Sequence, residues 1–132
     1  MSRLIASVAL LCAVTAGACA NDAPAASRPR SAATVEILEP EANATVTADT
    51  FSVRIGLDGG RIVSETSRNL TPDEGHVHVS VDGEILSQTY GLTQRLDAPA
   101  PGKHLLQVEF VAKDHGPFNP RVIASVPFEV EG

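Results

Sequence analysis

The feature of this sequence that most constrains its fold is an alternation of apolar and polar residues with a period of two. The stretch HVHVSVDGE, residues 76–84, puts Val77, Val79 and Val81 on one side of an extended chain. Because successive side chains of a strand point to opposite faces, this pattern predicts a strand with one buried face. No stretch of helical period follows residue 34, so the folded part is expected to be all-β.

The same alternation recurs along the chain and predicts the rest of the core. The stretches concerned are residues 34–40, 51–60, 104–115 and 122–130, with residues 84–92 as a further strand. Asp82-Gly83 is a hairpin turn signal, and Pro127, which lacks an N–H, predicts that the last strand lies at a sheet edge. Six or seven short strands, each half apolar, predict an antiparallel two-sheet sandwich.

The N-terminus has the pattern of an export signal. Arg3 precedes an apolar run from Leu4 to Val14, which is too short to span a bilayer and is followed by small residues. Residues 1–18 are therefore predicted to be a signal peptide. The stretch AGAC, ending at Cys19, resembles a bacterial lipobox, although Ala16 stands where leucine is usual. Lipid attachment at Cys19 is predicted; ordinary cleavage after Ala18 or Ala20 is the alternative.

Composition divides the remainder of the chain and limits its partners. Residues 19–33 are rich in Ala, Pro and Ser and are predicted to form a flexible tether, which leaves residues 34–132 as one domain. The formal net charge of −6 argues against nucleic-acid binding. Tryptophan is absent and Tyr90 is the single tyrosine, so an aromatic platform for sugars or bases is not expected.

Several motifs resemble a known group of domains. ILEPEANATV, residues 37–46, looks like the opening of many bacterial Ig-like domains. GHVHVSVDGE, PGKHLLQVEFVAKDH and GPFNPRVIASVPFEV together are similar to exported bacterial domains with Gly-His-x-His, Pro-Gly-x-His and Asp-His-x-Pro motifs. The resemblance covers residues 75 to 130. It implies an extracytoplasmic antiparallel Ig-like β-sandwich of about seven strands and supplies no activity.

Three of the four histidines are expected to gather on one outer surface. His76 and His78 lie roughly 7 Å apart on the face opposite the valines. If the valines are in the core, these two histidine side chains should point outward. By parity, His115 ends its own strand on the outward face. In an Ig-like sandwich these two strands are antiparallel neighbours, so the three rings should converge. His104, with the parity of the core and roughly 36 Å along the strand from His115, is expected to have a structural role.

Three imidazoles and a carboxylate are suitable ligands for Zn²⁺ or Cu²⁺. The predicted metal ligands are His76, His78, His115 and Asp114, with Asp73 and Glu74 as other candidate carboxylates. The alternative is that these histidines only make hydrogen bonds, and that His115 braces its loop as Asn and Asp do in turns.

The sequence therefore predicts an exported, lipid-anchored Ig-like binding domain that faces the periplasm or the cell surface and carries a candidate Cu or Zn site. The first alternative is a metal-free structural or protein-interaction module of the cell envelope. A metal-dependent enzyme is a third hypothesis, which we do not favour, because the sequence has no recognisable nucleophile elbow or phosphate loop and no thiol after residue 19. The expected partners are a membrane, through the lipid, and a protein.

Overall fold

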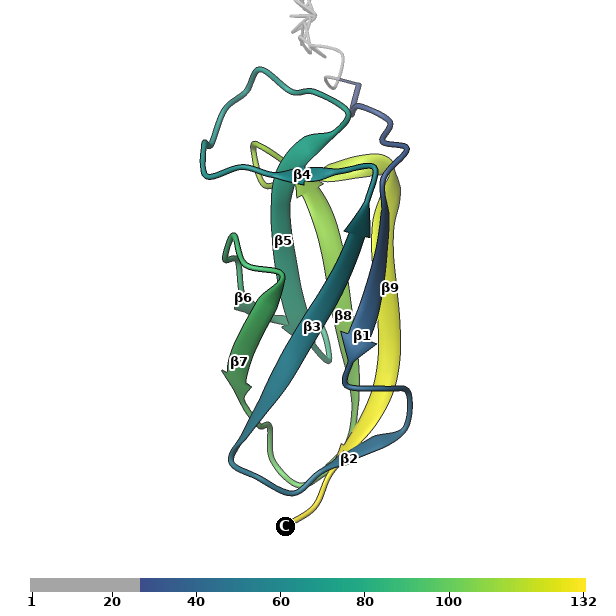
Figure 1. Cartoon of the computed structure of the whole chain (residues 1–132), viewed down its shortest axis with the longest axis vertical. Coiled ribbons are helices and arrows are strands. Elements are labelled where there is room, and N and C mark those ends of the chain that lie inside the picture. Colours follow the sequence, from purple (N-terminus) through teal and green to yellow (C-terminus); the bar gives the residue numbers. More distant parts are fainter. Residues whose placement is uncertain (1–26) are drawn as a thin grey trace, which may run out of the picture.

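The computed structural model describes residues 27–132, and all of their regular structure is β-strand (Figure 1). The strands are β1 (Thr34–Glu39), β2 (Ala44–Val46), β3 (Thr50–Asp58), β4 (Arg61–Ile62), β5 (Glu74–Val81), β6 (Glu84–Ser87), β7 (Thr93–Asp97), β8 (Gly102–Ala112) and β9 (Pro117–Val130). The predicted all-β Ig-like sandwich is confirmed, with seven longer strands and the two short strands β2 and β4. The predicted signal peptide and Cys19 lie outside the described residues.

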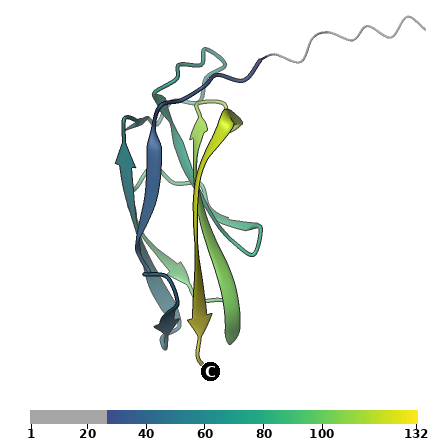
Figure 2. The ribbon, with the colours of Figure 1, turned by 90° about the vertical axis from the view of Figure 1, so that its right-hand side faces the viewer.

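The strands form two sheets that face each other, which Figure 2 shows edge-on. One sheet has the order β1-β3-β7; the other has the order β2-β9-β8-β5-β4, and β6 pairs with β5. All longer pairings are antiparallel, including the predicted pairing of β5 with β8. The short strands add two parallel pairs, β2 with β9 and β4 with β5. Residues 27–132 include no helix that could cross a membrane.

The core lies between the sheets and uses the faces that the alternation predicts. Val77 and Val79 of β5 are fully buried, as are Leu106, Val108 and Phe110 of β8. From the opposite sheet, β3 contributes every second residue, which together form its inner face. Its buried side chains are Phe51, Val53 and Ile55.

The segment after β5 differs from the expectation of one strand over residues 84–92. Asp82 and Gly83 both have positive φ, at 52° and 88°, which is the geometry of the predicted hairpin turn. However, β6 ends at Ser87, and the chain then crosses to the other sheet as β7, which pairs with β3. A segment that passes from one sheet to the other cannot keep one face buried throughout. The alternation of apolar and polar residues is therefore interrupted between Ser87 and Thr93.

The last strand, β9, lies at the edge of its sheet over most of its length. It has 14 residues, and β2 pairs only with its residues from Phe128 to Val130. Pro117, Pro120 and Pro127 lie in this strand, and none of them has an N–H to donate to a neighbour. The predicted edge position is therefore correct for β9 as far as Pro127, and β2 lies beside the residues that follow.

Close packing between β5 and β8 generates the first prediction. A Cβ atom at Gly75 would collide with the backbone carbonyl of Val111 and lie 3.1 Å from the Phe110 ring. Because backbone cannot move aside as a side chain can, Gly75→Ala should lower the free energy of unfolding by about 1–3 kcal/mol or more. Gly56→Ala is the matched control, since a Cβ there would meet its nearest atoms at an ordinary 3.7 Å. Equal urea midpoints for the two variants would contradict this packing.

Candidate functional site

The candidate site lies where β5 begins and β8 ends. His76 pairs with Val111 in the register of these strands, and His78 pairs with Glu109. Both histidines stand on the face opposite the buried valines, as the alternation predicts. The end of β8 therefore lies beside the start of β5, and the turn that follows β8 comes near the two rings.

His115 lies in this turn and not in the strand to which its parity assigned it. β8 ends at Ala112, and the His115 N–H donates to the Ala112 carbonyl at 2.9 Å. The backbone of His115 has a φ of 62°, in the left-handed region that few non-glycine residues adopt. Extrapolation of the strand alternation across residue 112 was wrong, because the chain reverses direction there.

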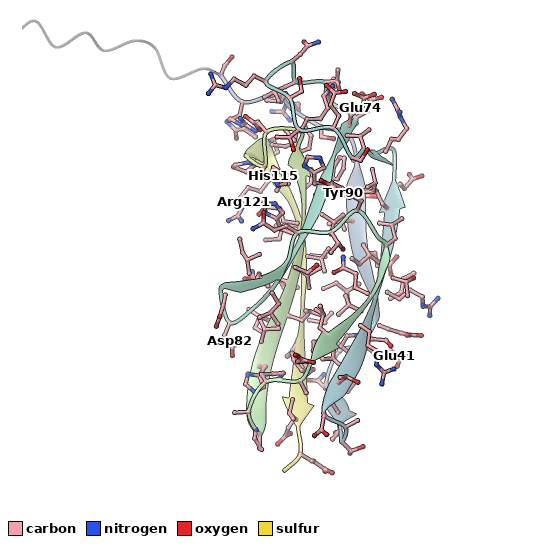
Figure 3. All side chains as sticks on the ribbon, turned by 90° about the vertical axis from the view of Figure 1, so that its left-hand side faces the viewer. Glu41, Glu74, Asp82, Tyr90, His115 and Arg121 are labelled. Atoms are coloured by element: carbon pink, nitrogen blue, oxygen red, sulfur yellow. The ribbon has the colours of Figure 1, made fainter. Side chains whose placement is uncertain are left out.

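The three rings nevertheless come together as expected. His78 Nε2 lies 3.0 Å from His115 Nδ1, and their ring centroids are 5.3 Å apart. The His76 ring lies beside His115, with centroids separated by 4.3 Å. Figure 3 shows His115 and Tyr90 at the same end of the domain as Glu74. Residues from β5 and from the β8–β9 turn thus form one cluster, here called the histidine cluster: His76, His78 and His115.

The expectation that both β5 histidines face solvent was wrong for His76, whose exposed fraction is 0%. The loop of residues 63–73 covers the ring, and the carbonyl of Glu65 lies 3.1 Å from His76 Nε2. Tyr90 contacts the ring edge-on, with centroids 5.3 Å apart. Leu70 of the same loop packs on the core, and the Ser67 N–H donates to the Lys113 carbonyl.

The hydrogen bond of His76 determines where its proton lies. A carbonyl oxygen can only accept, so the neutral ring must donate from Nε2 to Glu65. Its Nδ1 atom then carries a lone pair, and this atom is buried without a hydrogen-bond partner among residues 27–132. A buried acceptor left unpaired costs about 1–3 kcal/mol, so it is an unusual feature for a residue with a purely structural role.

The surroundings of His76 and His78 favour neutral rings. Burial lowers the pKa of His76 below its ordinary value, and the neighbouring His115 lowers it further. Burial is also the main cause of the lowered pKa of His78, to which His115 contributes and which Glu109 opposes. Neutral imidazoles have the lone pairs that metal binding requires.

His78 and His115 are the half-buried members of the cluster, and His78 also borders a hollow. A hollow of about 290 Å³ lies on the outer face of the six-stranded sheet beside it. The lining residues are His78, Ser80, Gly83, Ile85, Gln107, Glu109, Arg121 and Ile123. A small ion could therefore reach His78 without passing through the core.

The predicted carboxylate Asp114 makes different contacts. Its Oδ2 accepts from Arg28 Nη1 at 2.6 Å, and its Oδ1 accepts from Arg28 Nη2 at 2.8 Å and from the Gly116 N–H at 3.0 Å. The bidentate bond to Arg28 lowers the pKa of Asp114 to about 2. Both oxygens of the carboxylate therefore have partners outside the histidine cluster.

The two other candidate carboxylates are also outside the histidine cluster. Glu74 accepts from Lys113 Nζ at 2.9 Å and from Arg61, and the Lys113 bond is the main cause of its lowered pKa. Asp73 is exposed. Within residues 27–132, no three His, Cys, Asp or Glu side chains already surround a common point that could hold a metal ion. The facing nitrogens of His78 and His115 are the nearest approach to such a site.

Sequence reasoning missed the residues that enclose the cluster. Glu65 supplies a backbone carbonyl, which any residue would provide, so no sequence signal could identify it. Arg28 lies in the segment predicted to be a flexible tether, yet it bonds to the domain 86 residues away. The unusual length of the loop at residues 58–75 was the available signal that something covers this end of the sheet.

His104 is separate from the cluster and has the structural position expected of it. Its Nε2 lies 2.7 Å from the Ala100 carbonyl, and its Nδ1 lies 2.7 Å from Asp82 Oδ2. Both partners accept hydrogen bonds, so the ring is best satisfied when both nitrogens are protonated. The Asp82 bond accordingly raises the pKa of His104, and the His104 bond lowers the pKa of Asp82.

Comparisons with known proteins give limited likenesses. No family model matches the sequence, and no curated protein does. An engineered protein of known crystal structure is 14% identical, with a TM-score of 0.49, over 76% of this chain and 20% of its own. CopC from Methylosinus trichosporium OB3b is 16% identical, with a TM-score of 0.38, over 75% of this chain and 93% of its own. This chain thus spans a fifth of the engineered protein's length, and at these scores neither structure assigns it a function.

The His104–Asp82 pair generates a pH-dependent prediction. The raised pKa of His104 stabilises the fold below about pH 6.5, and this contribution fades as pH rises through the folded-state pKa. The lowered pKa of Asp82 stabilises it above about pH 4, and this contribution fades as pH falls through the folded-state value. The stability lost in Asp82→Asn should therefore be greatest between these limits and smaller at pH 9.

Urea unfolding at pH 5.5 and pH 9 measures this difference. Asp97→Asn is the control, because Asp97 is exposed and its side chain makes no hydrogen bond or ion pair among residues 27–132. A loss in Asp82→Asn that is the same at both pH values would show that the pair contributes through packing and not through charge.

Proposed function

We propose that this chain is an exported binding domain whose histidine cluster holds a divalent cation, Zn²⁺ or Cu²⁺. The observation that carries the proposal is the pair of ring nitrogens, His78 Nε2 and His115 Nδ1, that face each other at 3.0 Å. The ring of buried His76 lies next to His115, and its Nδ1 has no hydrogen-bond partner among residues 27–132. The role is binding, and a catalytic role has no support among the described contacts.

The separation of the facing nitrogens is close to that of two ligands on one metal ion. Two nitrogens bound at 2.0–2.1 Å in a tetrahedral site are about 3.3 Å apart. The pair would therefore need to open by only a few tenths of an ångström to admit the ion between the rings. A third ligand would come from His76, whose ring would have to turn its Nδ1 toward the ion, or from water in the hollow beside His78.

The ligand type favours borderline transition metals over hard cations. Imidazole nitrogens suit Zn²⁺ and Cu²⁺, whereas Ca²⁺ and Mg²⁺ prefer oxygen ligands. The carboxylates nearest to the turn, Asp114 and Glu74, already have cationic partners in Arg28 and Lys113. A site of neutral imidazoles also needs no thiolate, which an oxidising compartment would convert to a disulfide.

The proposed location follows from the N-terminal sequence. A signal peptide over residues 1–18 and a lipid on Cys19 would hold the domain at a membrane, facing the periplasm or the cell surface. In that arrangement the cation site would lie at the end of the domain where the described chain begins, because residues 27–33 run past the β8–β9 turn (Figure 2).

A metal-free interaction module is the second candidate function. A separation of 3.0 Å is also that of a hydrogen bond between two neutral imidazoles. In addition, Ile85, Leu86 and Tyr90 are each at least 41% exposed and lie close together in the sequence after the β5–β6 turn. Ile85 and Leu86 lie on β6 and Tyr90 lies between β6 and β7, and exposed apolar side chains of this kind are suited to contact with a protein partner.

Calorimetric titration with ZnCl₂ or CuCl₂ separates these two functions. The wild-type protein should bind one ion saturably, and His78→Ala and His115→Ala should each weaken binding by at least about 100-fold, because each removes a direct ligand. Affinity should be steady near neutral pH and fall below about pH 6, where protons compete with the ion for the imidazole nitrogens. The lowered pKa values of His76 and His78 keep these two rings neutral to a lower pH than an ordinary histidine.

His104→Gln is the matched control for these variants. It should reduce stability, through loss of the bond to Asp82, and leave ion affinity nearly unchanged. Equal losses of affinity in the His78, His115 and His104 variants would mean that the cluster is not the site. The absence of saturable binding by the wild-type protein would leave the interaction module as the function.

Lipid attachment is tested separately by metabolic labelling with a palmitate analogue. The wild-type chain should be labelled and Cys19→Ala should not, because Cys12 lies within the apolar run that is removed with the signal peptide. Label that persists in Cys19→Ala would exclude the predicted lipobox and favour ordinary cleavage nearby.

A further inference from the structure

The turn that carries His115 is held in a conformation that a free chain would rarely adopt. The turn comprises residues 113–116, between β8 and β9, and His115 has a positive φ within it. Two backbone bonds close the turn, from the His115 N–H to the Ala112 carbonyl and from the Ala112 N–H to the Gly116 carbonyl, each 2.9 Å long. Since the left-handed region is unfavourable for histidine, other contacts must stabilise this arrangement.

Arg28 supplies those contacts from outside the turn. Its two terminal nitrogens donate to the two carboxylate oxygens of Asp114, and its Nε donates to the Pro117 carbonyl at 2.7 Å. One planar guanidinium therefore bridges the residue before His115 and the second residue after it. Both partners of the ion pair are about three-quarters buried, with exposed fractions of 28% and 27%, so water screens the pair less than it screens a surface pair.

The turn has a glycine at a position where the guanidinium approaches its backbone closely. A Cβ atom at Gly116 would lie 2.6 Å from Arg28 Nη2, so a larger residue there would displace the arginine. The neighbouring Pro29 carbonyl accepts from the Asn119 N–H at 2.9 Å, which fixes the segment along the start of β9. Arg28 is thus seated by contacts on both sides, and residues 28 and 29 are part of the folded unit.

We propose that Arg28 is a positioning residue for the cation site, which makes ion affinity depend on docking of the N-terminal segment. The inference rests on the proposed function of the histidine cluster. Arg28 contacts none of the three rings. It acts by holding the turn so that His115 Nδ1 stays opposite His78 Nε2, and release of the turn would separate the two nitrogens.

The coupling must act in both directions. If docking of the segment raises affinity for the ion, then a bound ion strengthens docking of the segment by the same factor. This segment leads back toward Cys19, the predicted point of lipid attachment. The site would therefore respond to whether the chain next to the anchor lies on the domain or is drawn away from it.

The test is a ZnCl₂ titration of the full-length chain in detergent with four variants. Arg28→Ala and Asp114→Asn should each weaken Zn²⁺ binding by about 10–100-fold, which is typical of residues that orient a ligand without binding the metal. Arg28→Lys should recover part of the affinity, because an ammonium can still donate to one carboxylate oxygen. Arg30→Ala is the matched control, since Arg30 is exposed and has no ion pair among residues 27–132.

A second measurement on the metal-free protein distinguishes positioning from general stability. The ring resonances of His115 and His78 in NMR spectra should shift in Arg28→Ala and stay in place in Arg30→Ala, while the core methyl resonances of Val79 and Leu106 remain unchanged. Unaltered Zn²⁺ affinity in both Arg28→Ala and Asp114→Asn would overturn this inference and leave the proposed function intact. Failure of the wild-type chain to bind Zn²⁺ and Cu²⁺ would overturn both.

Discussion

The pairing of β5 with β8 is the interaction on which the rest of this structure depends. Seven residue pairs, from Gly75 with Ala112 to Val81 with Leu106, fix the register. This register buries Val77, Val79 and Phe110 between the sheets and leaves His76 and His78 on the outer face. A slip of one residue would exchange the two faces, so the hydrophobic core and the position of the histidines are determined together.

The pairing alone does not make a site; three segments outside the long strands complete it. The loop of residues 63–73 buries His76, the turn of residues 113–116 brings His115 over His78, and Arg28 holds that turn. The result is a polar cluster enclosed on the outer face of a sheet, where most side chains would meet water. An enclosed imidazole with an unpartnered nitrogen is hard to explain by stability alone.

Much of the fold could be predicted because a strand's alternation reports its own two faces. The valines of β5 and the apolar residues of β8 were assigned to the core on this basis, and Asp82-Gly83 marked the hairpin. The convergence of three histidines followed from the pairing of their strands. His115 was nonetheless predicted to lie in a strand, because the alternation of residues can be counted past Ala112, where β8 ends and the backbone turns.

The contacts that the sequence did not reveal join residues far apart along the chain. Nothing near His76 indicates that the Glu65 carbonyl covers it, since alternation describes a strand and not what lies on it. Asp114 was predicted as a ligand from its proximity to His115 in sequence, and its bond to Arg28 comes from a segment whose composition suggested a free linker. Such contacts are a property of the assembled sandwich and of no single stretch of residues.

The part of the β9 edge that β2 and residues 28–29 leave unpaired has a consequence for contacts between copies of this domain. An exposed strand of this length presents unpaired backbone groups that could recruit a second chain and extend into a cross-β stack. Pro117 and Pro127 offer no N–H on this edge, the Asn119 N–H donates to the Pro29 carbonyl, and β2 occupies the last residues of the strand. Neighbouring copies would therefore meet only short unpaired stretches of this edge and not a continuous row of donors.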